Sequence, residues 1–173
     1  MTTKLKTQIL HEVDNLFNAE TEFLKELTSH ASTRGNEQSA QKFMASELSG
    51  RGYEVDSWNV NVDDIAHLPG FSPVIGNYED AINVVGAHRS KSNHGRSLIL
   101  NGHIDVVPEG PLEMWDTPPY EPRIDNGWMY GRGVGDMKAG LAANLFALDA
   151  IRASGYLPAS DVFFQSVVEE ECT

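Results

Sequence analysis

A histidine and an aspartate follow an apolar segment directly, in the run LILNGHIDVVPEG. His103 and Asp105 lie two residues apart, so they project toward one face if the strand continues through them. A neutral imidazole binds zinc through one ring nitrogen, and a nearby carboxylate can hold the other ring N–H and fix its orientation. The pair is also typical of two polar side chains that satisfy each other at a strand end.

Another acidic residue, Asp136, stands in the glycine-rich run GRGVGDMKAG, just before an expected helix. The glycines around it permit tight backbone geometry. Aspartate at such a position commonly caps the helix that follows. A carboxylate also has two oxygens and can bridge two cations a few ångströms apart, and the two roles can coexist. The segment alone leaves both interpretations open.

Three consecutive glutamates, residues 169–171, follow an apolar segment and are expected at its rim. A solvated acidic turn is the simpler interpretation. A nearby dication would offset their mutual repulsion, and neighbouring glutamates could then act as metal ligand and general base. With His103 and Asp136, the triplet provides an imidazole, a bridging carboxylate, a terminal carboxylate and a free carboxylate. A hydrolytic two-metal centre needs these residue types.

The candidate site residues must be positioned by the helices and strands that the sequence predicts, and these alternate along the chain. Apolar residues at three- and four-residue steps predict helices over residues 4–30, 40–48 and 141–151. The helix over 40–48 is expected to begin at a cap provided by Ser32 or Asn36 and to end at the glycines of the run GRG.

Period-two alternation and short apolar runs predict four strands, of which the middle two are expected to be sheet neighbours. A proline- and glycine-rich connection follows the first strand, and an aromatic-containing ordered loop over residues 106–135 precedes the helix at 141. The fold class is α/β, a three-layer sandwich with a mixed, mostly parallel sheet, in which ligands gather at the carboxyl ends of strands. The strands cover residues 53–62, 81–86, 97–102 and 162–168.

Composition excludes several classes of function. The 173 residues suffice for one domain, and their net charge of -12 argues against a nucleic-acid or acidic-membrane partner, which requires clustered Lys and Arg. The N-terminal segment has no apolar run of the length that a signal peptide or membrane span needs. A single cysteine, Cys172, forms no internal disulfide. We therefore expect a cytoplasmic protein.

Four motifs in fixed order, NGHIDVVPEG, WDTPPYEP, GRGVGDMKAG and VVEEE, carry a family resemblance. They resemble the zinc-dependent family of acetylornithine deacetylases, succinyl-diaminopimelate desuccinylases, aminoacylases and glutamate carboxypeptidases. The resemblance covers about residues 20–173, and the motifs between residues 98 and 171 carry most of it. It implies an incomplete catalytic domain with a zinc exopeptidase-like fold.

The resemblance also implies a role for each site residue. The resemblance implies that His103 binds one metal, that Glu171 binds the other and that Asp136 bridges both metals. It also implies that Glu170 is the general base and that Asp105 orients His103. The cofactors would be two divalent ions, zinc in the first place and cobalt as the alternative. The peptide bond after the bridging aspartate is often cis in the family, which makes Asp136-Met137 a candidate.

The function implied is hydrolysis of an amide bond in N-acyl amino acids or small peptide-like substrates. Family members are longer, and they add a further acidic ligand, a C-terminal histidine and a lid domain used for dimerisation. We therefore expect residues 1–173 to be the N-terminal portion of the catalytic domain of a homodimeric parent, and to be inactive or weakly metal-binding alone, because each metal lacks one ligand. A non-catalytic homologue and a di-zinc aminopeptidase or carboxypeptidase remain alternatives.

Overall fold

The computed structural model describes residues 2–72, 78–92 and 94–171; residues 73–77 of the predicted connection and Cys172 lie outside the described residues. A four-stranded sheet forms the centre, in the order β1-β2-β6-β3. The small second sheet is a hairpin of β4 and β5. The strands are β1 Glu54–Asn59, β2 Ile82–His88, β3 Leu98–His103, β4 Arg123–Asp125, β5 Trp128–Tyr130 and β6 Val162–Val167.

The main sheet is mixed, as the sequence predicts, but its strand order differs from the prediction. Strands β2 and β3, expected to be neighbours, are separated by β6, which pairs antiparallel with β2 and parallel with β3. Burial explains this order: Phe164 of β6 is fully buried, whereas Ile99 of β3 is 59% exposed and suits an edge. Because β1 also pairs antiparallel with β2, only one of the three pairings among these described strands is parallel. The prediction of a mostly parallel sheet is therefore wrong for these strands, although the sheet is mixed.

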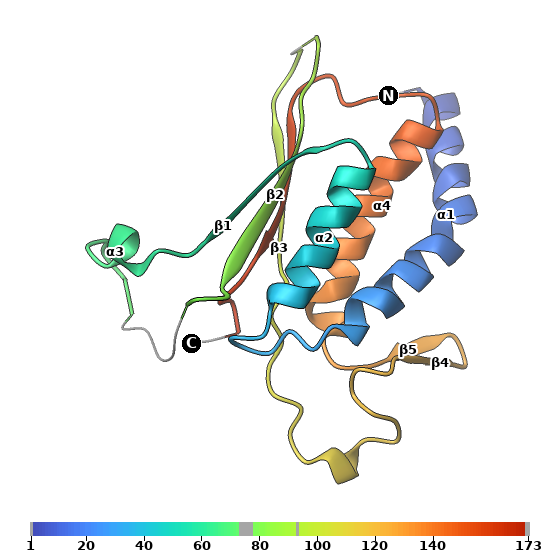
Figure 1. Cartoon of the computed structure of the whole chain (residues 1–173). Coiled ribbons are helices and arrows are strands. Elements are labelled where there is room, and N and C mark those ends of the chain that lie inside the picture. Colours follow the sequence, from blue (N-terminus) through green and yellow to red (C-terminus); the bar gives the residue numbers. More distant parts are fainter. Residues whose placement is uncertain (1, 73–77, 93, 172–173) are drawn as a thin grey trace.

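Three long helices cover one face of this sheet: α1 (Thr3–Ser29), α2 (Gln38–Gly50) and α4 (Ala139–Ala153). Figure 1 shows α2 and α4 next to the sheet, with α1 on their outer side, where it packs on α4. The described layers are thus the sheet, the α2/α4 pair and α1. The α/β class is confirmed, with these helices gathered on a single side. None of the described helices has the length and apolar character needed to cross a bilayer.

Helix α2 ends where the sequence predicts but begins differently. Gly52 adopts a φ of +79°, and the Tyr53 N–H returns to the Leu48 carbonyl, a typical glycine-terminated helix end. The expected cap by Ser32 or Asn36 is wrong, because Glu37 occupies the N-cap position without a side-chain capping bond. The Ser32 hydroxyl donates instead to the Ile104 carbonyl, at 2.7 Å. This hydrogen bond therefore joins the turn before α2 to the residue that follows β3.

The long loop over residues 106–135 is ordered, as predicted. It contains a short 3-10 turn, η1 (Leu112–Met114), and the β4–β5 hairpin. The Arg132 guanidinium lies over the Trp115 ring at 5.2 Å, and Arg123 lies over Tyr130 at 4.7 Å. A short helix, α3 (Val62–Ile65), follows β1. An irregular helical turn, η2 (Val134–Lys138), leads from the loop into α4.

Candidate metal centre

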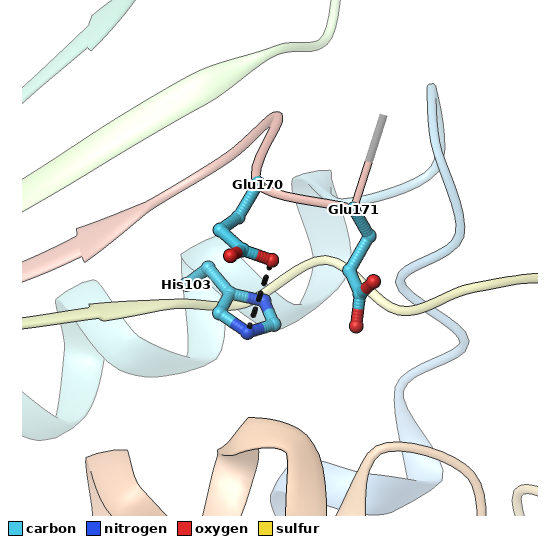
Figure 2. A group of neighbouring side chains, drawn as sticks. All are labelled: His103, Glu170 and Glu171. Atoms are coloured by element: carbon cyan, nitrogen blue, oxygen red, sulfur yellow. Dashed lines mark ion pairs between the residues drawn. The ribbon is translucent and has the colours of Figure 1, made fainter. Parts of the chain in front are cut away.

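The carboxyl ends of β3 and β6 bring the histidine and two of the glutamates together. His103 is the last residue of β3 and lies opposite Val167 in the parallel register with β6. The glutamates follow β6, so Glu170 and Glu171 emerge at the same edge of the sheet, as Figure 2 shows. One potential ligand atom from each of His103, Glu170 and Glu171 lies within 4.8 Å of the others.

The geometry of His103 determines which ring nitrogen is available. Its Nδ1 lies 2.9 Å from the backbone carbonyl oxygen of Asp105, an acceptor that requires Nδ1 to carry the proton. Nε2 then has the free lone pair in the neutral ring, and it faces Asp136 Oδ1 at 3.1 Å and Glu170 Oε2 at 3.7 Å. Nε2 is therefore the nitrogen that can bind a metal.

Asp105 contacts both His103 and Glu171. The sequence predicts that its carboxylate holds the His103 ring, but the backbone carbonyl makes the shorter contact. Its backbone carbonyl accepts the His103 ring hydrogen bond, and its carboxylate Oδ1 lies farther from Nδ1, at 3.5 Å. The other carboxylate oxygen, Oδ2, accepts the backbone N–H of Glu171 at 2.8 Å. Asp105 is 1% exposed. One buried residue thus fixes the histidine ring and the backbone of a glutamate.

Asp136 projects toward His103 from the turn that precedes α4. The peptide bond between Asp136 and Met137 is cis, as the resemblance implies. Helix α4 begins at Ala139 with Lys138 at its N-cap position and no side-chain capping bond, so Asp136 does not cap this helix. The side chain of Asp136 is 80% exposed, apart from its contact with His103 Nε2. Its carboxylate is free to contact a cation.

Lys138, which the sequence analysis did not single out, anchors this turn to α1. Its side chain is completely buried, and Nζ donates to the carbonyl oxygens of Leu27 at 3.1 Å and His30 at 2.8 Å. Burial lowers the pKa of Lys138 to about 7. The lysine is therefore a hydrogen-bonded tie between the end of α1 and the turn that carries Asp136. Lysine is rarely buried, so nothing in its sequence context indicated this role.

Replacing Lys138 by Met is expected to destabilise the protein by about 1–3 kcal/mol, because a buried carbonyl and a partly buried carbonyl lose their donor. The pH dependence has a definite sign. Since the folded pKa lies below the unfolded one, native stability increases as pH rises from about 7 toward the unfolded pKa, whereas the Met variant lacks this gain. The deficit of Lys138→Met should therefore be larger in alkaline than in mildly acidic buffer. Urea unfolding of both proteins in both buffers measures the difference in the free energy of unfolding. An equal difference in the two buffers contradicts the lowered pKa of Lys138.

Glu169, the first residue of the acidic triplet, points away from His103. Its carboxylate Oε2 accepts from Arg34 Nη2 at 3.0 Å and from the Tyr78 hydroxyl at 2.6 Å. Its backbone φ is +74°. The structure thus separates the triplet, with Glu170 and Glu171 beside the histidine and Glu169 bound elsewhere. Neither Arg34, in a polar turn, nor Tyr78, in an irregular connection, carried a signal in the sequence.

The donor set fits a divalent metal of the zinc type. One imidazole nitrogen with carboxylate oxygens around it is a common zinc ligand set. Burial lowers the pKa of His103, but the hydrogen bonds with the Asp105 carbonyl and the Asp136 carboxylate and the charges of Asp105 and Glu170 raise it, and the net shift is upward. A metal ion must displace this proton from His103.

Zinc affinity should consequently rise with pH. While pH lies below the raised pKa of His103, each unit of increase should strengthen zinc binding by up to about tenfold, because one proton is displaced. Calorimetric titrations in two buffers of different ionisation enthalpy measure both the affinity and the proton released. Binding that is independent of pH and releases no proton would mean that His103 is not a ligand.

The chain is similar to several known proteins. Residues 99–173 match the model of peptidase family M20/M25/M40. The chain is 39% identical over 137 residues to N-formyl-4-amino-5-aminomethyl-2-methylpyrimidine deformylase of Halalkalibacterium halodurans, covering 79% of this chain and 28% of that protein. It is 30% identical over 148 residues to succinyl-diaminopimelate desuccinylase of Leptothrix cholodnii, covering 86% of this chain and 35% of that protein. The chain thus spans about a third or less of these relatives.

Solved structures share the fold. The dipeptidase Dug1p of Saccharomyces cerevisiae superposes with a TM-score of 0.80 at 24% identity, over 99% of this chain and 36% of that one. Human carnosine dipeptidase 1 superposes with a TM-score of 0.75 at 22% identity, over 93% of this chain and 34% of that one. The matched family model includes His103, Asp136 and the glutamate triplet, and the chain belongs to peptidase family M20/M25/M40.

Proposed function

We propose that the protein takes part in metal-dependent hydrolysis of an amide bond, with the site at the ends of β3 and β6 as its catalytic centre. The observation that carries this proposal is the convergence of His103, Glu170 and Glu171, whose potential ligand atoms lie within 4.8 Å of one another. Asp136, in the turn before α4, places its Oδ1 atom 3.1 Å from His103 Nε2. A buried histidine with carboxylates on several sides suits a dication better than a solvated acidic turn.

Each residue then has a role that matches its position. His103 and Asp136 would hold one metal, Asp136 and Glu171 the other, and Asp105 keeps His103 oriented through its backbone carbonyl. Two zinc ions, when bound, would supply a nucleophilic water at neutral pH and polarise a carbonyl group. Glu170, whose side chain is 62% exposed, would accept the proton from the attacking water and pass it to the leaving amine.

The proposed substrates are N-acyl amino acids or small peptide-like amides, with the deacylase type preferred. Support comes from the names of relatives: a deformylase and a desuccinylase both remove an acyl group from nitrogen. A non-catalytic homologue is disfavoured, because such a protein need not keep an imidazole, a bridging carboxylate, a ligand glutamate and a second glutamate together. Cleavage of dipeptides is the second candidate function. It ranks below removal of an acyl group, because the similarity to solved dipeptidases supports the fold alone.

The described residues provide two protein ligands for each proposed metal, whereas a catalytic zinc usually has about three. We propose that the remaining ligands, and the contacts that select a substrate, come from outside residues 2–171. We also propose that the natural polypeptide contains a lid domain and forms a homodimer. The 173-residue chain by itself should then bind zinc weakly and hydrolyse amides slowly or not at all.

An activity panel tests the function. The 173-residue chain and the natural polypeptide that contains it are assayed with N-formyl, N-acetyl and N-succinyl amino acids and with dipeptides, in the presence of zinc or cobalt. We expect hydrolysis by the natural polypeptide that a chelator abolishes and added metal restores. Hydrolysis by the natural polypeptide that the chelator does not affect contradicts the proposal, and so does the absence of hydrolysis by that polypeptide with every amide at saturating metal.

A further inference from the structure

We propose that Arg34, Tyr78 and Glu169 form a clamp that positions Glu170 and Glu171 for metal binding and proton transfer. This inference rests on the proposed function, because the clamp acts through those two glutamates. None of the three clamp residues is assigned a role in the chemistry itself. Each is a positioning residue, and each comes from a different part of the chain: the turn before α2, the segment before β2 and the segment after β6.

The backbone of Glu169 is the first observation. Its φ of +74° lies in the left-handed region, which residues other than glycine seldom adopt unless surrounding contacts hold them there. This conformation turns the chain sharply just after β6, so that the side chain of Glu169 leaves in a different direction from those of the next two residues. Figure 2 shows Glu170 and Glu171 beyond this turn, with their carboxylates on the side of His103.

The contacts of the Glu169 carboxylate are the second observation. One oxygen, Oε2, accepts both the Arg34 hydrogen bond at 3.0 Å and the Tyr78 hydrogen bond at 2.6 Å. The Arg34 and Glu169 side chains are 33% and 22% exposed, so water screens this pair less than a surface pair. Burial and the Glu169 carboxylate raise the pKa of Tyr78, which keeps its hydroxyl a donor. Charge-assisted bonds of this kind are stronger than neutral ones.

Anchors on both sides of Glu169 transmit its position to the site. The backbone N–H of Val168 donates to the Asn83 side chain at 3.1 Å, and that of Glu171 donates to the Asp105 carboxylate at 2.8 Å. Glu170 lies between the clamp and the second of these anchors, 3.7 Å from His103 Nε2. Releasing Glu169 would free the turn and let both Glu170 and the Glu171 backbone move away from the histidine.

The acidic groups around the clamp favour a cation at the position of Arg34. Glu37 is fully buried at the start of α2, and the negative charges of Asp105 and Glu169 act on its carboxyl group. Burial raises the pKa of Glu37, the nearby amides of Glu37 and Gly35 lower it, and those two charges raise it further. Arg34 is the cation that contacts Glu169 in this acidic surrounding. Without it, repulsion would favour moving the triplet outward.

The test compares Glu169→Gln and Tyr78→Phe with a control, Glu54→Gln. Glu54 also pairs with an arginine, Arg89, but on the edge strand β1 with both side chains largely exposed. The first readout is hydrogen exchange of the Glu171 amide, measured by NMR on the full 173-residue chain without metal. The second is cobalt affinity, followed by absorption. Thermal unfolding of every variant shows whether the fold is retained.

We expect Glu169→Gln to speed exchange of the Glu171 amide. The same variant should weaken cobalt binding by about tenfold or more, as loss of an outer support of a metal site does. Tyr78→Phe should do the same to a smaller extent, and Glu54→Gln should change neither. Unchanged amide exchange in both clamp variants overturns the clamp. Absence of cobalt binding by the natural polypeptide that contains the chain counts against the proposed function, whereas amide exchange in the 173-residue chain tests the clamp independently.

Discussion

Replacing Glu170 by Gln should lower the rate of amide hydrolysis by the natural polypeptide by about 100- to 10,000-fold, the usual contribution of a general base. Glutamine keeps the size of the side chain and its hydrogen-bonding oxygen but cannot accept the proton. The Glu170 side chain is 62% exposed, which leaves it accessible to a water and a substrate. Zinc affinity should change little, because the proposed ligands are His103, Asp136 and Glu171.

The same variant separates two roles that the geometry allows. Glu170 lies within the group of residues that can contact a metal, so it is a potential ligand as well as a base. Steady-state rates and zinc titration are therefore measured on the same preparation, with Glu54→Gln as the control for loss of a surface carboxylate. A large loss of zinc affinity would make Glu170 a ligand, and unchanged hydrolysis would exclude it as the base.

Replacing His103 by Ala should weaken zinc binding by at least about 100-fold, the upper range for losing an outer partner of a metal ligand. His103 provides the imidazole of the cluster, and its orientation is fixed by the 2.9 Å contact with the Asp105 carbonyl. The remaining carboxylates would bind a hard cation such as calcium more readily than zinc. Selectivity between these two metals should therefore fall together with zinc affinity.

The control for this variant is His11→Ala, because His11 is an exposed histidine on α1. Calorimetry of the native chain and both variants with zinc and with calcium gives the affinities and their ratio. His103 is only 4% exposed, so unfolding of each variant must be measured as well. If His103→Ala binds zinc as the native chain does, the metal lies elsewhere.

Much of the fold follows from periodicity, but the strand order does not. Helices α1, α2 and α4 and the strand β6 appear where apolar spacing predicts them. Strands β2 and β3 run in opposite directions, as a hairpin would, yet β6 from the end of the chain lies between them. Local pattern cannot reveal such a long-range insertion. Its only sign in the sequence is that β6 is the more apolar strand, with Phe163 and Phe164 at its centre.

The site was predictable in its residues and less so in its contacts. A strand that ends at His103 and another that ends before the glutamates meet at one edge because they pair in parallel, so their convergence follows from topology. The supporting residues Arg34, Tyr78 and Lys138 were missed, because each lies far along the chain from the group that it contacts. Asp105 contacts His103 through its backbone, which no side-chain pattern encodes.

The most direct test of the proposed centre is to locate the metal. Crystals of the 173-residue chain grown with zinc are measured at the zinc absorption edge, and the anomalous difference map is calculated. We predict a peak about 2.0–2.1 Å from His103 Nε2, shared with Asp136, and a second peak at about 2.0–2.2 Å from a Glu171 carboxylate oxygen. Zinc peaks only at other surface groups, with none at His103 Nε2, would contradict the proposed centre.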